Sequence, residues 1–247
     1  MKRLLIVGGT GDAVELARQA VSLPRLEVIT SLAGRTSAPK KLLGAVRIGG
    51  FGGEAGLVEY LQAAQIDLLI DATHPFAAQM SGHVAGAAAK VGIPWLMLIR
   101  PGWSRLPQDD WIEVESIEAA VGAIPARAER IFLTIGRQQL APFGSLRDKW
   151  CLMRSIDPPD SSMLLPPGEL LLDRGPFSLD QELQLLKDYR IDAIVSKNSG
   201  GDATYAKIIA ARQLGLPVVM VQRPVVPRGE VVTDVAGAIN WLRDRQQ

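Results

Sequence analysis

One loop late in the chain combines a cation with small, turn-forming residues. The stretch SKNSGG, residues 196–201, follows the apolar run DAIV and contains Lys197, Asn198 and Ser199 before two glycines. Hydroxyl, amide and backbone N–H groups donate hydrogen bonds to carboxylates, and a lysine adds positive charge. Because the loop lacks the glycine spacing of a Walker loop, we predict that these residues and Gly200 bind a carboxylate at the start of a helix.

A glycine turn follows the first apolar run of the chain. GGTGDAVEL, residues 8–16, places Thr10 among Gly8, Gly9 and Gly11. Glycines let a phosphate approach the backbone, and the N–H groups at the start of a helix favour a negative charge. We expect these four residues to bind a dinucleotide phosphate, with the Thr10 hydroxyl as an additional donor. The alternative is a tight strand-to-helix turn, since the turn departs from the usual dinucleotide fingerprint.

The second apolar run ends in EVITSLAGRTS, without an acidic residue. An NAD site usually has Asp or Glu at this point for the ribose hydroxyls, whereas an arginine can pair with the 2′-phosphate of NADP. We therefore predict NADP rather than NAD, with Ser31 and Arg35 as cofactor contacts. The alternative is that Arg35 is a solvated loop cation.

The motif DATHPFA begins at Asp71 and includes Thr73 and His74. We predict that these three residues contact the cofactor; for His74, a structural hydrogen bond is the alternative. The chain's other histidine, His83, is expected to be structural. No third ligand follows at metal spacing, so no zinc site is expected, and no nucleophile elbow of a serine hydrolase is present.

Further candidates for a substrate site lie in predicted loops. Phe51 is surrounded by glycines in RIGGFGGEAG, so it borders either the dinucleotide or a flat substrate, or belongs to a plain strand-to-helix loop. Single arginines stand at other loop edges: Arg137, Arg174 and Arg223. Each alone is typical of a solvated cation. Together they predict a substrate with several carboxylates.

The elements that must position these loops follow an alternating pattern. Short apolar runs, typical of buried parallel strands, alternate with alanine- and leucine-rich segments of helical periodicity. The apolar runs are LLIV (4–7), EVIT (27–30), DLLI (67–70), WLMLI (95–99), IFLTI (131–135), DAIV (192–195) and VVMV (218–221). This alternation predicts an α/β protein with mainly parallel sheets.

The pattern also repeats within the chain. Residues 66–101 align with residues 191–224, and each segment reads strand, polar loop, alanine-rich helix, Gly-x-Pro turn, strand and Arg-Pro. The segments 111–124 and 230–242 then end the two halves similarly. We predict two similar α/β domains, 1–126 and 127–247, with a cleft between them. The alternative is a generic resemblance of strand–helix–strand units.

Composition limits the classes of function. With 27 basic and 26 acidic residues, the formal net charge is +1, so nucleic-acid binding is not expected. The single Cys151 fits a reducing compartment and is expected to be a buried thiol. No apolar run approaches the length of about 20 residues needed to span a bilayer. We therefore expect a cytoplasmic protein.

Nine motifs together resemble the precorrin-6A reductase family of cobalamin biosynthesis. They are GGTGDAVEL, SLAGR, GGFGGEAGL, DATHPFA, IGRQ, LLDRGPF, VSKNSGG, TYAKIIAAR and VVMVQRP, and they extend from residue 8 to about residue 224. The resemblance implies two Rossmann-like domains, an NADP-binding one at 1–126 and a substrate-binding one at 127–247. It also implies that the protein uses NADPH to reduce one double bond of the tetrapyrrole precorrin-6A, giving precorrin-6B. It also implies possible transfer of the macrocycle to neighbouring enzymes of the pathway.

Under this resemblance the lysine loop holds an acidic side chain of the macrocycle. We predict that Lys197 or Ser199 orients a carboxylate, and that water or Tyr205 delivers the proton that follows the hydride. Three alternatives remain open. They are a cobalt-precorrin-6A reductase of the anaerobic route, an NADP-dependent reductase or epimerase for another small substrate, and a non-catalytic protein that senses NADPH.

Overall fold

The computed structural model describes residues 1–34 and 43–245 of the chain. The chain forms two compact units. Unit 1 contains Met1–Pro101 and Pro224–Gln247, and unit 2 contains Gly102–Arg223. Each unit is built on one sheet, and every strand pairing within the described ranges is parallel.

The sheet of unit 1 has six strands in the spatial order β12-β5-β4-β1-β2-β3. In its central strands, Leu4–Val7 of β1 and Leu68–Ile70 of β4 are apolar and buried, which suits parallel strands covered on both faces. Its strands are β1 (Lys2–Val7), β2 (Leu26–Leu32), β3 (Ala45–Ile48), β4 (Leu68–Asp71), β5 (Trp95–Leu98) and β12 (Glu230–Val232).

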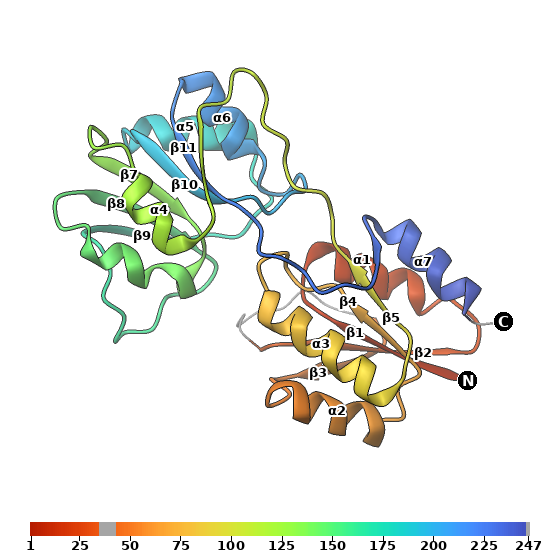
Figure 1. The fold of residues 1–247 in the computed structure, drawn as a ribbon. Helices are drawn as coiled ribbons and strands as arrows, with labels where there is room; N and C mark the ends of the chain where they lie inside the picture. Colours follow the sequence, from red (N-terminus) through yellow and green to blue (C-terminus); the bar gives the residue numbers. More distant parts are fainter. Residues whose placement is uncertain (35–42, 246–247) are drawn as a thin grey trace. The chain divides into compact units, whose positions relative to one another are not determined.

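Helices cover both faces of this sheet (Figure 1). They are α1 (Gly11–Ala20), α2 (Gly53–Ala63), α3 (Ala78–Val91) and α7 (Val235–Asp244). One core cluster joins α1 and α7 to the side chains of one sheet face, including Leu4 and Ile6. A second cluster joins α2 and α3 to the opposite face, including Leu5 and Val7. Successive residues of β1 thus supply both cores.

The sheet of unit 2 also has six strands, in the order β6-β11-β10-β7-β8-β9. Its strands are β6 (Trp111–Val114), β7 (Arg130–Thr134), β8 (Trp150–Ser155), β9 (Gly168–Leu172), β10 (Ala193–Lys197) and β11 (Val218–Val221). Its α-helices are α4 (Ile117–Ala123), α5 (Leu179–Asp188) and α6 (Ala206–Leu214). A core cluster includes Phe132 and Ile194 of the sheet, Leu186 of α5 and Ile208 of α6. The segment after β7 forms only the 3₁₀ turns Arg137–Gln139 and Ala141–Ser145.

The two sheets match position by position, so the internal repeat is real at the level of topology. Strands β4 and β1 occupy the centre of one sheet, and β10 and β7 occupy the same places in the other. One edge strand of each sheet comes from the other half of the chain. Strand β6 precedes β7 in the sequence yet pairs with β11, whereas β12, at the end of the chain, pairs with β5 of unit 1.

This exchange corrects the predicted domain boundary between residues 126 and 127. Residues 102–126 belong to unit 2, and residues 224–247 belong to unit 1. Side-chain contacts explain why residues 102–126 belong to unit 2. The backbone N–H of Trp103 donates to Asn198 Oδ1 at 2.7 Å, and the buried Asp109 pairs with Arg212 of α6 at 2.8 Å. Both anchors hold the segment before β6 on unit 2.

The strands that apolar runs did not identify are mostly at sheet edges. All seven predicted runs lie in strands, namely β1, β2, β4, β5, β7, β10 and β11. The edge strands β3, β9 and β12 are largely exposed, so their sequences lack a buried pattern. The interior strand β8 contains Arg154 and Ser155, which are buried but polar. A hydropathy pattern cannot separate such residues from a loop.

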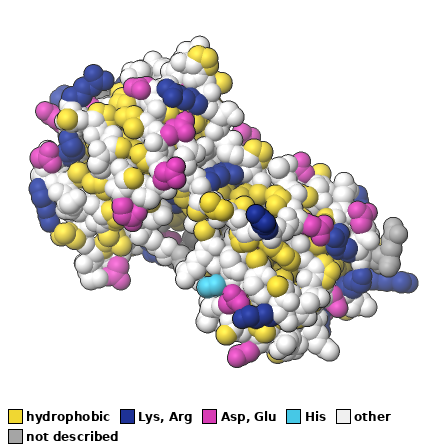
Figure 2. Space-filling model, viewed as in Figure 1, with side chains coloured by type: hydrophobic (Ala, Val, Ile, Leu, Met, Phe, Trp, Pro, Cys, Tyr) yellow, Lys and Arg dark blue, Asp and Glu magenta, His cyan; other side chains and the backbone are white. Residues whose placement is uncertain are grey.

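Acidic and basic side chains are interspersed over the face of the molecule that Figure 2 shows, in keeping with their nearly equal numbers. Within the described ranges, no helix is long and apolar enough to cross a membrane.

Candidate functional site

The glycine turn of unit 1 lies at the carboxyl end of β1, beside the end of β4. A Cβ on Gly8, whose φ is +142°, would lie 2.3 Å from the carbonyl oxygen of Ala72, so only glycine fits. The Gly8 N–H donates to the Ser31 carbonyl of β2 at 3.0 Å. Gly9 and Gly11 are exposed, and no atom lies within 4 Å of an added Cβ at Gly11. The turn is therefore tightly held on one side and open on the other.

Thr10 has a structural role at this turn. Its hydroxyl oxygen caps α1 by accepting from the Ala13 N–H at 3.1 Å, and its proton goes to the Ala72 carbonyl, also at 3.1 Å. The predicted use of this hydroxyl as a phosphate donor therefore conflicts with its contacts. In the first turn of α1, Asp12 pairs with Arg100 at 2.7 Å, which balances an acidic charge close to the open glycines.

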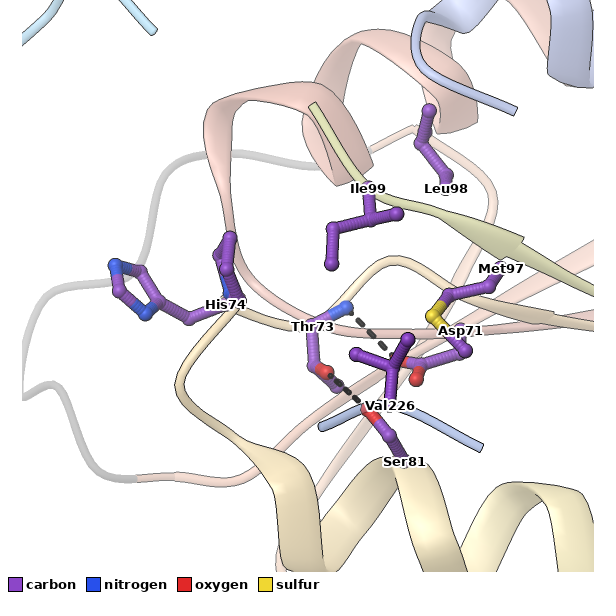
Figure 3. A pocket seen from close by; sticks show the side chains of 9 residues that line it. Asp71, Thr73, His74, Ser81, Met97, Leu98, Ile99 and Val226 are labelled. Atoms are coloured by element: carbon purple, nitrogen blue, oxygen red, sulfur yellow. Dashed lines mark hydrogen bonds between the residues drawn. The ribbon is translucent and has the colours of Figure 1, made fainter. Parts of the chain in front are cut away.

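The DATHPF loop surrounds a small recess at the ends of β4 and β5 (Figure 3). The recess is shallow and partly open to solvent. Asp71 is 1% exposed; its Oδ1 accepts from the Thr73 N–H at 3.0 Å, while Oδ2 is buried without a hydrogen-bond partner among the residues that the structure describes. Thr73 lies 3.5 Å from Ser81, oxygen to oxygen. The buried Oδ2 of Asp71 can therefore accept a hydrogen bond from a donor group of a ligand.

His74 lies at the rim of this recess. Its Nδ1 accepts from the Phe76 N–H at 3.2 Å, which is the structural alternative considered for this residue. In Figure 3 the imidazole points away from the carboxyl group of Asp71. Together with the glycine turn and Ser31, these loops meet at one edge of the sheet, because β4, β1 and β2 are neighbours and parallel.

Two further residues of this region, Arg35 and Phe51, were predicted as ligand contacts. Arg35 lies outside the described residues. Phe51, predicted as a substrate contact, belongs to unit 1, where the Arg47 guanidinium lies 3.9 Å from the centre of its ring. Its position in the unit of the glycine turn, under another side chain, argues against its assignment to the substrate site.

The polar residues of unit 2 gather at the carboxyl edge of the second sheet. Arg137 follows β7, Arg174 follows β9, Lys197 ends β10 and Arg223 follows β11. Since all these strands are parallel, their ends share one edge. The Nη1 of Arg137 donates to the Pro158 carbonyl at 2.9 Å, and Arg174 is exposed.

Several residues of the SKNSGG region hold the loop itself. The side chain of Asn198 accepts from the Trp103 N–H at 2.7 Å and donates to the Trp103 carbonyl at 3.2 Å. Arg223 donates to the carbonyls of Asn198 and Ser199, at 2.8 and 2.9 Å. These contacts argue against a direct role of Asn198 in substrate binding and give Arg223 a supporting one.

The helix after this loop begins later than predicted. Gly200 and Gly201 have φ values of +66° and +73°, and α6 begins only at Ala206. Two successive left-handed residues turn the chain away from a helical path, so the loop does not present a helix N-terminus at Gly201. Trp103 covers the loop and donates through Nε1 to the Gly201 carbonyl at 2.9 Å.

The hydroxyl group of Tyr205 contacts Arg212 of α6. Arg212, one of the anchors described above, donates through Nη2 to the Tyr205 hydroxyl oxygen at 3.1 Å, and the same guanidinium pairs with Asp109. The ring of Tyr205 lies 5.6 Å from that of Trp103. These contacts place the phenol beside Arg212 of α6. Because the phenol oxygen accepts this bond and its own proton is not used in it, the role of Tyr205 as proton donor stays a prediction.

Two lysines in unit 2 are strongly desolvated. Burial lowers the pKa of Lys197 to about 8. Lys207, 3% exposed on α6, has a pKa lowered to about 7, chiefly by burial and then by the charge of Arg154, against the opposite effect of Glu182. Its Nζ donates to the Thr204 carbonyl at 2.8 Å. Arg154 pairs with Glu182 at 2.7 Å, and both are buried. The ammonium groups near this edge are thus weaker bases than ordinary lysines.

The sequence analysis did not select Arg47, Trp103 or Lys207 as site residues. The last could have been found from periodicity, since Lys207 shares the buried face of α6 with Ala210 and Ala211. Within the part of the chain that the structure describes, no three His, Cys, Asp or Glu residues gather as for a metal ion.

Unit 1 thus has the strand order of the doubly wound dinucleotide-binding folds, with an open glycine turn at the point where that order reverses. The fold and this edge define the class of two-unit, parallel α/β proteins with nucleotide-binding topology. The sequence model of the family described as "Precorrin-6x reductase CbiJ/CobK" matches residues 3–243. The chain belongs to this family.

Similar proteins agree with this assignment over the full length. A precorrin-6A reductase of Rhodococcus erythropolis is 49% identical over 98% of this chain and 98% of its own. A solved structure titled "CobK precorrin-6A reductase" is 42% identical, covers 99% of this chain and 97% of its own, and superimposes with a TM-score of 0.93. A cobalt-precorrin-6A reductase of Methanothermobacter thermautotrophicus is 29% identical over 98% of this chain and 82% of its own.

Proposed function

We propose that this protein reduces one double bond of precorrin-6A with NADPH, in the cytoplasm, giving precorrin-6B for cobalamin biosynthesis. The observation that carries the proposal is the 49% identity to a precorrin-6A reductase across 98% of both chains. The metal-free macrocycle is the preferred substrate in this proposal, because three relatives named for the cobalt form are 27–30% identical, against 49% for the precorrin-6A reductase.

The residues of unit 1 fit a dinucleotide. The exposed Gly9 and Gly11 leave the backbone open at the start of α1, where a helix N-terminus favours a phosphate. The buried Asp71 Oδ2 beside the recess can accept a hydrogen bond from a ligand amide or hydroxyl. A buried acceptor without a partner costs about 1–3 kcal/mol. A donor in the recess would remove this cost and orient the ligand.

When bound, NADPH supplies the hydride, so the residues of the chain need only bind, orient and move a proton. In this proposal the cations at the carboxyl edge of unit 2 hold the acidic side chains of the macrocycle. Lys197 has the lowered pKa of about 8, so at neutral pH its ammonium still carries charge for a carboxylate and releases a proton more readily than an ordinary lysine. Ser199, two residues further on, is the proposed second donor to the carboxylate.

The testing experiment measures consumption of NADPH by absorbance, with precorrin-6A and separately with cobalt-precorrin-6A. Steady oxidation with a change in the pigment spectrum on the metal-free substrate is the expected result. Faster turnover of the cobalt form would reassign the substrate. Tight NADPH binding without oxidation on either macrocycle would contradict the reductase and favour a sensor. Binding without any dependence on Gly9 and Gly11 would contradict the proposed location of the cofactor.

A further inference from the structure

The carboxyl edge of unit 1 carries a guanidinium that the proposed function leaves unused. Arg47 lies on β3, paired in register with Ser31 of β2. Its Nη1 donates to the Gly49 carbonyl at 2.6 Å and to Ser31 Oγ at 3.3 Å, and its Nη2 donates to the Gly50 carbonyl at 2.8 Å. Two hydrogen bonds therefore hold the guanidinium against the loop that follows β3, and a third joins it to β2.

These contacts commit both Nη1 protons and one Nη2 proton. The Nε–H and the second Nη2–H remain, side by side on the same edge of the planar group. Across residues 1–34 and 43–245, no acceptor and no carboxylate is bound to this edge of Arg47. Two parallel N–H donors on one edge match the two oxygens of a phosphate or carboxylate.

Aromatic rings fix the plane of this guanidinium. Its central carbon lies 3.9 Å from the Phe51 ring centre and 5.1 Å from that of Tyr60. The two rings pack on each other with their centres 5.3 Å apart. Stacking and the carbonyl bonds together hold the side chain in one orientation, so little conformational entropy remains to be lost when an anion binds.

The position selects which anion this edge would meet. In dinucleotide-binding sheets, the group at the carboxyl end of the second strand reads the 2′ position of the adenosine ribose. Here β2 ends with Ser31 and Leu32, and its neighbour β3 presents Arg47 opposite Ser31. Neither residue at the end of β2 is acidic, so neither would repel a 2′-phosphate.

We propose that Arg47 binds the 2′-phosphate of NADPH through its Nε and Nη2 edge and is the residue that selects NADPH over NADH. Phe51 and Ser31 act as positioning residues that orient it. The inference rests on the proposed function in one respect only, that unit 1 binds a nicotinamide dinucleotide.

The test compares equilibrium binding of NADPH and NADH, and of 2′,5′-ADP and 5′-AMP, to the full chain. Arg47→Gln keeps a donor for the loop carbonyls but removes the charge and the paired edge. Loss of a charged, two-point hydrogen bond should raise the Kd of NADPH and 2′,5′-ADP about 10- to 150-fold. The Kd of NADH and 5′-AMP should change less than about twofold. Arg47→Lys, which restores charge without the paired edge, should recover only part of the loss.

Arg243→Gln is the matched control, because Arg243 is an exposed arginine of α7 in the same unit. It should leave all four constants unchanged. Thermal unfolding of each variant verifies the fold. Equal weakening of NADPH and NADH in a folded Arg47→Gln protein would overturn the inference, and so would an unchanged preference for NADPH. A wild-type protein that binds neither dinucleotide would instead contradict the proposed function, and one that reduces precorrin-6A with NADH as readily as with NADPH would overturn the inference alone.

Discussion

The two units share one strand order but differ at their equivalent edges. After β1, unit 1 has an open glycine turn and the ten-residue helix α1, capped by Thr10. After the equivalent β7, unit 2 has Gly136 and two short 3₁₀ turns, the second of which contains Pro142 and Gly144. Proline and glycine both disfavour a helix interior. Only unit 1 therefore retains a regular α-helix whose start could face a phosphate.

The loops after the next central strands differ in charge. Strand β4 ends in the buried acid Asp71, whereas β10 ends in the desolvated cation Lys197. In the proposed assignment, the edge of unit 1 receives a phosphate and hydrogen-bond donors, and the edge of unit 2 receives carboxylates. Equivalent positions of the repeated fold thus differ in charge through a few residues at the strand ends.

The largest expected effect is on stability, and it distinguishes the glycine turn at Gly8 from the equivalent turn at Gly136. Gly8→Ala should lower the free energy of unfolding by about 3 kcal/mol, because its Cβ would meet the Ala72 backbone at 2.3 Å and its φ is +142°. Gly136→Ala, with φ +84° and no atom within 4 Å, should lower it by only about 1 kcal/mol. Urea unfolding of both variants measures the difference. Equal losses would show that the two turns are under the same constraint.

Replacing the cation at the end of β10 tests the division of roles. Lys197→Met should reduce kcat/KM for precorrin-6A about 100-fold, because a charged carboxylate partner and a proton donor are both removed. The Kd of NADPH should change less than about twofold, since the proposed cofactor site is in unit 1. Lys187→Met, at an exposed lysine of α5, is the control. Full turnover, or a parallel loss of NADPH binding, would remove the proposed division.

The buried lysine of α6 should give unit 2 a distinctive pH dependence. The pKa of Lys207 is about 7 in the folded protein, below its ordinary value near 10.4, so the unfolded chain binds more protons between these values. Stability should therefore rise with pH by about 2 kcal/mol from pH 7 to pH 9 through this group, and not change through it below pH 6. The charges of Lys197, Arg154 and Glu182 act on the ammonium group of Lys207. The pKa of Lys197 is lowered as well, so its own titration also makes stability rise with pH.

Urea unfolding of Lys207→Met across this pH range provides the measurement. The variant should be more stable than the wild type at pH 6, with the difference shrinking toward pH 9. Parallel stability curves for the two proteins would show that Lys207 keeps an ordinary pKa. Lys187→Met again serves as a control, because its exposed ammonium should not alter the slope.

The smallest expected effect concerns helix caps. Thr10 makes a cap bond to Ala13 and a second bond to Ala72, whereas Ser116, which caps α4 in unit 2, has the single cap bond to Ala119 at 3.0 Å. Thr10→Ala should therefore cost about 1.5 kcal/mol and Ser116→Ala about 1 kcal/mol. Thr10→Ser should retain most of the stability, since it keeps the hydroxyl. Thermal unfolding measures all three, and equal losses for Thr10 and Ser116 would remove the structural role of the second bond.

The sequence alone determined the fold class, seven of the strands and the equivalence of the DATHPF and SKNSGG loops. These features depend on local hydropathy patterns and on repeated motifs, which neighbouring residues encode directly. It also predicted that the glycine turn, Ser31 and Asp71 contact one cofactor, and the structure places all three at one edge of the sheet because β4, β1 and β2 are parallel neighbours.

Only the tertiary structure decided which sheet received the segments 102–126 and 224–247. Either segment could pair as an edge strand, and the choice depends on contacts distant in sequence, such as Asp109 with Arg212 and Trp103 with Asn198. The same holds for the contacts of Asn198, Tyr205 and Arg47. A residue type shows which hydrogen bonds are possible, but packing decides which partners are within reach and which protons remain for a ligand.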